Sequence, residues 1–282
     1  MKGIKGIIYW VLAVFCCACM GQKGTDTEKE NRQMRKQLLL QEFADTLLSE
    51  QDTFPLNADK LFEDFLYLYA MEENVQRHRT IFPLPHRCAE GDSLIEKSEW
   101  IYQRIFPENE FYLMLFDNEE QMEIEKDTSI NQVVLSNVDV LTEQMKNYCF
   151  IRQNGRWALK NIESCFLKSS ENSDFLRFFS QFVNDSVYQN SCLEDPLTFV
   201  TVDSEDEFTI IEATINKEQW FAFAPVLPKG RLVVLDYGQK QLEKSLQKVV
   251  ILKDLSGSTY QIFHFDKEGK SWKMTKYEDV SN

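Results

Sequence analysis

The sequence predicts an α+β protein built from two tandem copies of one unit. Three observations lead to this prediction. An aromatic-rich amphipathic helix pattern occurs twice, over residues 61–84 and 174–197. Each copy is followed by apolar or alternating runs that favour β-strands. Each series of runs then closes on a glycine with a tryptophan close behind it.

The two helical stretches match when one is shifted by 113 positions, which places Pro83 on Pro196. The matched apolar residues recur at i, i+3, i+4 and i+7, the spacing of one helix face. The residues of this face, which we expect to be buried, are Phe62, Phe65, Leu66 and Tyr69 in one copy and Phe175, Phe178, Phe179 and Phe182 in the other. The repeat is domain-sized and predicts domains over residues 55–165 and 170–282.

Strand-like runs follow each helix in a similar order. They cover residues 98–105, 111–116, 132–140, 145–153 and 156–162, and then 208–213, 231–237, 242–253, 259–266 and 271–277. Asn154-Gly155 between two such runs is a strong hairpin signal. The closing pairs are Gly155 with Trp157 and Gly269 with Trp272.

This succession of elements resembles the nuclear-transport-factor-2-like (NTF2-like) fold. The order helix, Phe-x-x-Phe-x-x-x-aromatic, acidic residue, Gln, Pro-Leu is also similar to a group of uncharacterised lipoproteins from Bacteroidota. The resemblance implies two tandem cone-shaped domains, each a long N-terminal helix packed in a curved antiparallel sheet. The residues it would place around the cone cavities are Phe65, Tyr69, Trp100, Trp157, Phe178, Phe182 and Trp272.

Residues 1–19 have the pattern of a secretory signal peptide, with Lys2 and Lys5 before a short apolar run. The end of this run resembles a bacterial lipoprotein signal, and Cys19 after Ala18 is the expected lipidation site, with Cys17 or simple cleavage as alternatives. We therefore expect a lipid-anchored protein of the cell envelope, on the periplasmic face or the surface of a Gram-negative bacterium. Residues 20–54 read as a polar tether followed by an amphipathic helix.

The formal net charge is −14, and the sequence contains no basic block. Nucleic acids and anionic membrane surfaces are therefore poor partners, and membrane contact is expected through the N-terminal lipid only. The 282 residues suffice for two ordinary domains.

Few residues suggest chemistry. His78, His86 and Cys88 lie close together in sequence, but their spacing fits no common zinc pattern, and His264 reads as a surface or hairpin residue. The acidic stretches 117–127 and 203–207 lack the spacing of a calcium loop and are expected to be solvated. We therefore assign no metal, cofactor or catalytic residue.

Four cysteines follow the signal-like segment: Cys88, Cys149, Cys165 and Cys192. An envelope location permits disulfides. However, a two-residue turn at Asn154-Gly155 would place Cys149 opposite Lys160 and Cys165 opposite Gln144. A direct Cys149–Cys165 cross-strand bridge is therefore not predicted, and buried free thiols are preferred among the possible states.

The sequence favours a non-catalytic binding module for a small molecule, glycan or protein. The alternatives are an acid–base enzyme that acts on a small apolar substrate in one cavity, and an envelope scaffold. We expect no His, Asp or Glu to pair with a Tyr, Ser or Cys inside a cavity. A buried carboxylate bonded to such a partner at an open pocket of about 300 Å³ or more would favour the enzyme.

Overall fold

The computed structural model describes residues 59–203, 209–239, 242 and 245–281, all within one compact unit, Pro55–Asn282. Cys19, the signal-like residues 1–19 and the segment 20–54 lie outside the described residues. Within the part that is described, no helix is long and apolar enough to cross a membrane.

Two helices followed by six strands occur twice, with short helical segments inserted at different points between the strands. The first series is α3 (Phe62–Met71), α4 (Glu73–His78), β1 (Leu84–Arg87), β2 (Ser93–Ile95), β3 (Phe111–Phe116), η2 (Glu119–Lys126), β4 (Gln132–Asp139), β5 (Gln144–Gln153) and β6 (Arg156–Phe166). After η3 (Leu167–Ser169), the second series is α5 (Ser173–Asn184), α6 (Ser186–Ser191), β7 (Leu193–Val202), β8 (Ile210–Ile215), η4 (Lys217–Gln219), α7 (Trp220–Phe223), β9 (Leu232–Asp236), β10 (Gln247–Asp254), β11 (Tyr260–Glu268) and β12 (Ser271–Asp279). This mixture confirms the α+β class.

Two short helices stand where one long helix was expected at the start of each series. The backbone is extended at Glu72, between α3 and α4, and at Asp185, between α5 and α6. The Asp185 carboxylate accepts hydrogen bonds from the backbone N–H groups of Val187 and Tyr188. The acidic residue of the repeat therefore occupies an N-cap position, which ends one helix and begins the next.

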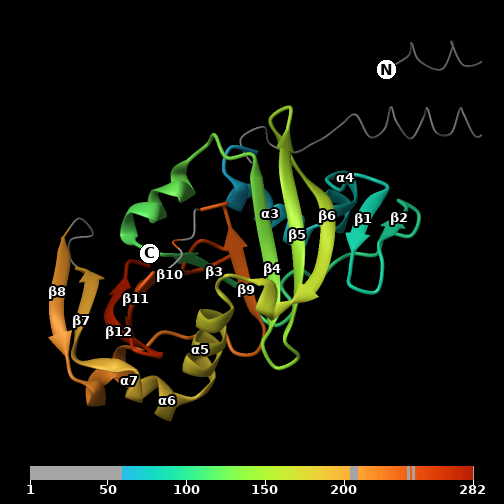
Figure 1. The fold of residues 1–282 in the computed structure, drawn as a ribbon. Helices are drawn as coiled ribbons and strands as arrows, with labels where there is room; N and C mark the ends of the chain where they lie inside the picture. The colour runs from blue at the N-terminus through green and yellow to red at the C-terminus, as the bar shows by residue number, and fades with distance from the viewer. Residues whose placement is uncertain (1–58, 204–208, 240–241, 243–244, 282) are drawn as a thin grey trace, which may run out of the picture. The chain divides into compact units, whose positions relative to one another are not determined.

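All the described strands join in one sheet, in the order β2-β1-β6-β5-β4-β9-β3-β10-β11-β12-β7-β8 (Figure 1). The order is symmetric about its centre, because β2-β1-β6-β5-β4 in one half corresponds to β8-β7-β12-β11-β10 in the other. The central pair breaks the symmetry of the sequence. β9 of the second series lies beside β4, and β3 of the first series lies beside β10.

The two series have thus exchanged one strand each. β3 and β9 also pair with each other, in parallel, with Leu113 opposite Val234. Every other strand pair joins members of the same series. The two halves of the unit are consequently tied together by backbone hydrogen bonds rather than by side-chain packing alone.

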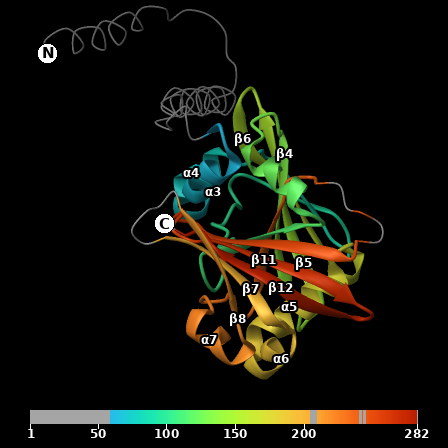
Figure 2. The ribbon, with the colours of Figure 1, turned by 90° about the vertical axis from the view of Figure 1, so that its left-hand side faces the viewer.

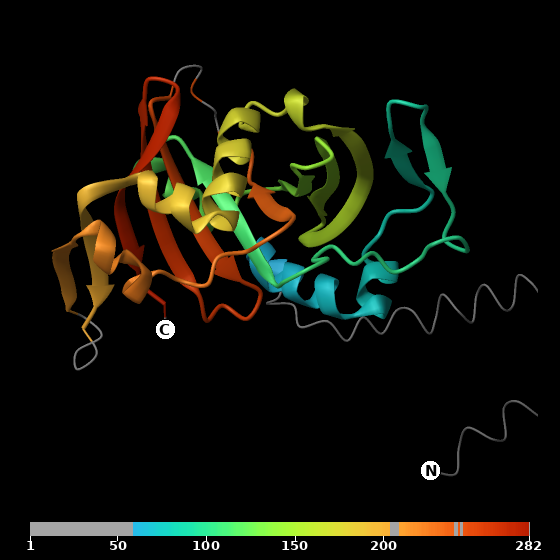
Figure 3. The same ribbon diagram turned by 90° about the horizontal axis from the view of Figure 1, so that it is seen from below.

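The helices α3 and α4 of the first series and the short helices α6 and α7 of the second lie at opposite ends of the unit (Figure 1 and Figure 2). In Figure 2, α3 and α4 lie at one end of the view, while α6 and α7 lie at the other. Figure 3, seen from below, shows α5 packed inside the sheet of the second series. Phe175 of α5 makes an edge-to-face contact with Trp272 of β12, with ring centroids 5.1 Å apart.

Burial of the repeated helix face is confirmed. The eight residues expected in the core are all 0–8% exposed: Phe62, Phe65, Leu66, Tyr69, Phe175, Phe178, Phe179 and Phe182. The repeated glutamines are buried as well, and each binds a later segment of its own series. Gln76 bonds to the backbone of Gln103, and Gln189 accepts a hydrogen bond from the Trp220 indole.

Most of the other strand predictions hold within a few residues, but two regions differ. Residues 98–105 contain no strand or helix, and β1, β2 and β7 lie where no strand was predicted. These are edge or near-edge strands with short or irregular apolar patterns. Their pairing partners, rather than their own residues, determine that they are extended.

The Asn154-Gly155 hairpin forms, and both residues have positive φ, as a type I′ turn requires. A β-bulge between Cys149 and Phe150 then shifts the register by one residue. Cys149 therefore faces Asn161 rather than Lys160, and Cys165 faces Met145 rather than Gln144. The four described cysteines are free thiols, and burial raises the pKa of Cys149 to about 11.

Candidate functional site

The strand exchange creates a row of three polar side chains across three strands. Tyr112 of β3 faces Lys253 of β10, and Lys253 in turn faces Tyr260 of β11. Tyr112 belongs to the first series, whereas the other two belong to the second. The Lys253 ammonium lies 4.7 Å from the centre of the Tyr260 ring, a cation–π distance.

Two carboxylates of the first series bind this lysine. Lys253 Nζ lies 3.1 Å from Glu63 Oε2, at the start of α3, and 2.5 Å from Glu125 Oε2, in η2. The Glu125 side chain is only 8% exposed, and its other oxygen accepts a hydrogen bond from the Tyr260 hydroxyl at 3.0 Å. Glu63 also accepts a hydrogen bond from Tyr237, just after β9, at 3.3 Å.

Burial controls the protonation of this network. Desolvation raises the pKa of Glu125, although Lys253 and Tyr260 act against it. Desolvation and the nearby carboxylates raise the pKa values of Tyr112 and Tyr260. Both phenols therefore keep their protons near neutral pH and can donate hydrogen bonds.

A pocket of about 720 Å³ opens over the row. Three tyrosines line it, Tyr67, Tyr112 and Tyr260, and Tyr67 is 45% exposed. Its charged lining residues are Glu63, Asp64, Asp254 and Lys253, so carboxylates outnumber the one cation. Desolvation, and to a lesser extent the charge of Glu63, raise the pKa of Asp64.

The seven residues expected around the cone cavities are all buried, at 0–9% exposure. Phe65, Tyr69 and Trp157 belong to the aromatic core around Phe150, and the Tyr69 hydroxyl bonds to Thr80 at 2.9 Å. The second core contains Phe178, Phe182 and Trp272, which pack with Phe175 and Phe265. Trp100 packs on Phe82. Their assignment to a ligand cavity remains a prediction.

The other candidate residues are dispersed. His78 bonds to the backbone of Asn74, His86 on β1 bonds to Ser164, and Cys88 bonds to the Gly91 carbonyl. These three residues therefore have separate local partners.

The acidic stretch 117–127 was expected to be solvated, and this was wrong for two of its members. Asp117 is 3% exposed and binds Lys248 of β10, while Glu125 belongs to the pocket network. The second stretch, 203–207, lies mostly outside the described residues.

The Glu125–Tyr260 pair also corrects the expectation about carboxylate–tyrosine pairs. It is a largely buried carboxylate bonded to a phenol that lines an open pocket of more than 300 Å³, although Glu125 itself is not among the lining residues. The pair lies at the junction of the two series rather than within one helix-and-sheet unit. No local sequence signal identifies it, because its members come from η2 and β11 and meet only through the exchanged strand.

The geometry has a counterpart among known proteins. The crystal structure of an NTF2-like protein from Bacteroides fragilis is 36% identical in sequence and superposes with a TM-score of 0.74, over 81% of this chain and 99% of that chain. A search of curated proteins found no match. Residues 40–279 match the family described as a domain of unknown function, DUF4348. The chain therefore has an NTF2-like fold and belongs to the DUF4348 family.

Proposed function

We propose that this protein is a non-catalytic binding protein whose ligand site is the tyrosine-lined pocket over Lys253. The NTF2-like fold suggests a ligand-binding or scaffold role. The observation that carries the proposal is that Glu63, Lys253 and Tyr260, which line a pocket of about 720 Å³, are held in one hydrogen-bonded set with Glu125 behind them. Pockets of this size with a few fixed polar groups are typical of small-ligand sites.

The lining supports a hydroxyl-rich ligand with a positive charge. Tyrosine faces offer apolar and cation–π contacts, and Glu63, Asp64 and Asp254 offer acceptors for hydroxyl and ammonium groups. The excess of carboxylates disfavours anions, as does the net charge of −14. An oligosaccharide of glucosamine is the simplest probe with these properties.

The Glu125–Tyr260 pair is the kind of arrangement that would favour the acid–base alternative, but only Tyr260 lines the pocket and Glu125 does not. Both Glu125 oxygens already accept hydrogen bonds, one from Lys253 and one from Tyr260. The raised pKa of Tyr260 holds its proton on the phenol, so the hydroxyl is suited to donate a hydrogen bond rather than to abstract a proton.

The proposal includes a tandem origin for the fold. The repeated order of elements derives from two NTF2-like units, 55–165 and 170–282, with one strand exchanged between them, and the symmetric strand order supports this origin.

The proposal also includes a lipid anchor. Cys19 carries the lipid that holds the protein in the cell envelope. The intact mass of the mature protein from its native host tests this anchor, since an N-terminus other than lipidated Cys19 would contradict it.

Titration calorimetry with a glucosamine trisaccharide tests the pocket. We expect one site per chain, and Tyr67→Ala should weaken binding at least about tenfold, because an exposed stacking platform is lost. Phe221→Ala is the matched control, since Phe221 is 50% exposed on α7 and does not line the pocket. Equal affinities for wild type and Tyr67→Ala, or preference for an acidic trisaccharide, would contradict the proposal.

A further inference from the structure

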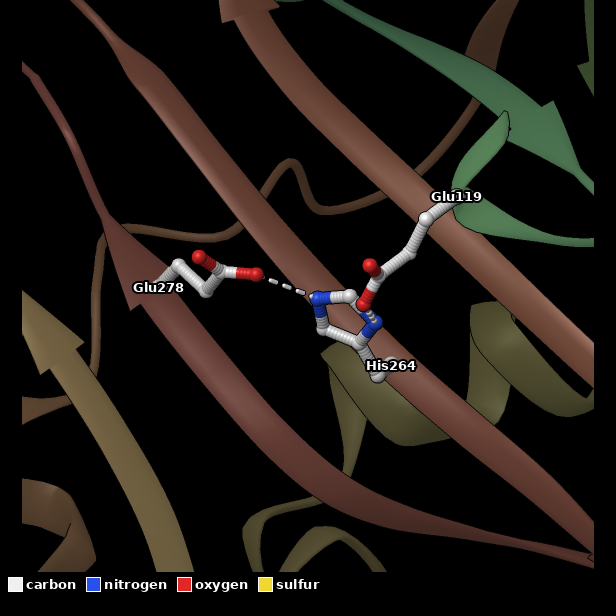
Figure 4. A group of neighbouring side chains, drawn as sticks. All are labelled: Glu119, His264 and Glu278. Carbon is white, nitrogen blue, oxygen red and sulfur yellow. Dashed lines mark hydrogen bonds and ion pairs between the residues drawn. The ribbon is translucent and has the colours of Figure 1, made fainter. Parts of the chain in front are cut away.

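A second cluster of polar side chains lies away from the pocket, on the strands that end the second series. His264 of β11 and Glu278 of β12 are diagonal cross-strand neighbours, and Glu119 at the start of η2 reaches them from the first series. The imidazole lies between the two carboxylates (Figure 4). His264 Nε2 is 2.6 Å from Glu278 Oε1, and Nδ1 is 3.3 Å from Glu119 Oε1.

We propose that Glu119, His264 and Glu278 bind a divalent transition-metal ion, with Zn²⁺ as the best match. One ligand atom from each of the three residues can be chosen so that all lie within 4.8 Å of one another. A tetrahedral zinc site with bonds of about 2.0–2.2 Å needs ligand atoms roughly 3.4 Å apart. Glu119 contacts Nδ1 and Glu278 contacts Nε2, so an ion on Nε2 requires the Glu119 side chain, which is 65% exposed, to rotate toward the Glu278 side of the ring.

The ligand set also indicates the character of the site. One imidazole and two carboxylates are borderline and hard donors that suit Zn²⁺, and three protein ligands leave a fourth position for water or another molecule. His264 and Glu278 are well buried, with side chains 12% and 17% exposed, and their strands hold them in place. The ion would tie η2 of the first series to β11 and β12 of the second.

Lys276 is the competitor for this ion. Its Nζ lies 2.9 Å from Glu278 Oε1 and 4.0 Å from Glu119 Oε1, so it neutralises the same carboxylates. The Lys276 side chain is 31% exposed and long, so it can turn to solvent when an ion enters. Because Lys276 must give up these contacts, its removal should strengthen metal binding while leaving the three ligands intact.

Titration of the full metal-free chain with Zn²⁺, followed by calorimetry and thermal melting, tests the site. We expect one ion per chain and a higher Tm with Zn²⁺. His264→Ala and Glu119→Gln should each weaken binding at least about tenfold, and Lys276→Met should strengthen it. His78→Ala is the matched control, because this histidine is exposed and bonds only to its own helix among the described residues.

Visible absorption of bound Co²⁺ provides a second measurement of the site that does not depend on stability. A site with imidazole and carboxylate ligands should give visible absorption bands in the wild type, and these should be lost in Glu119→Gln, whose exposed position leaves the fold intact. No saturable Zn²⁺ binding, or binding that is unchanged in both His264→Ala and Glu119→Gln, would overturn the proposal. Weaker binding in Lys276→Met would also contradict it.

Discussion

Tyr112 and Lys253 face each other across the antiparallel pair β3–β10, although one belongs to the first series of elements and the other to the second. The pairing exists because β3 takes the place beside β10 that β9 would occupy in an unexchanged unit. It brings Glu63 and Glu125 to the same lysine. The candidate pocket is therefore a product of the exchange, and neither series could form it alone.

The continuous sheet predicts one cooperative unfolding transition. Phe65→Ala in the first core and Phe178→Ala in the second should each lower the free energy of unfolding by about 3–5 kcal/mol, because each removes a buried aromatic ring. Both should shift the same transition, measured by denaturant unfolding with circular dichroism. Phe166→Ala, at a residue that is 47% exposed, is the control and should have little effect. Two separate transitions, each sensitive to one variant, would indicate independent domains.

Loss of the pocket lysine should be costly. Lys253→Met leaves Glu63 and Glu125 facing each other without their cation, and Glu125 is nearly buried. Breaking a buried pair by removing one partner costs about 3–5 kcal/mol. Lys126→Met removes an exposed pair with Glu123 and should change the free energy of unfolding by less than about 1 kcal/mol. If both variants unfold at the same denaturant concentration, Lys253 does not organise the network.

The turn after β10 should make stability depend on pH. Burial alone would raise the pKa of Asp254, but hydrogen bonds from Ser256, Ser258 and the Thr259 backbone lower it below its usual value. The folded state thus binds the proton less tightly than the unfolded chain. The stability from this carboxylate is present above about pH 4 and is lost as pH falls through the folded pKa.

Asp254→Asn removes this titration. The variant should be less stable than wild type at pH 7, and the difference should narrow as pH falls below about 4. Parallel urea unfolding curves at several pH values measure it. A difference that is constant with pH would show that the Asp254 charge is not what the turn stabilises.

Much of the fold could be predicted from local patterns. The helix face that carries Phe65 and Phe178 follows directly from its spacing, and the Asn154-Gly155 turn follows from its dipeptide. The bulge at Cys149 could not be predicted, because one extra residue in a strand leaves no mark in an alternating pattern. The break at Glu72 and Asp185 was visible only as a repeated acidic residue.

The candidate site was beyond sequence reasoning for a different reason. Glu125 looks like any member of an acidic loop, and Lys253 looks like the end of a strand. The Lys253–Glu125 ion pair depends on which strand lies beside β10. Strand order is set by long-range pairing, which the local hydrophobic pattern does not specify. The contact between Glu119 of η2 and His264 of β11 could not be predicted from the sequence for the same reason.

The strand exchange can be tested directly with a disulfide cross-link. Phe111 of β3 is paired with Asp254 of β10, and both are partly exposed. In a chain whose natural cysteines are replaced by serine, we would introduce Phe111→Cys and Asp254→Cys, oxidise, and map the product by peptide mass spectrometry. The account predicts an intramolecular disulfide between positions 111 and 254 in the folded monomer. Failure of these two positions to cross-link, with position 111 instead cross-linking to a cysteine placed on β4, would contradict it.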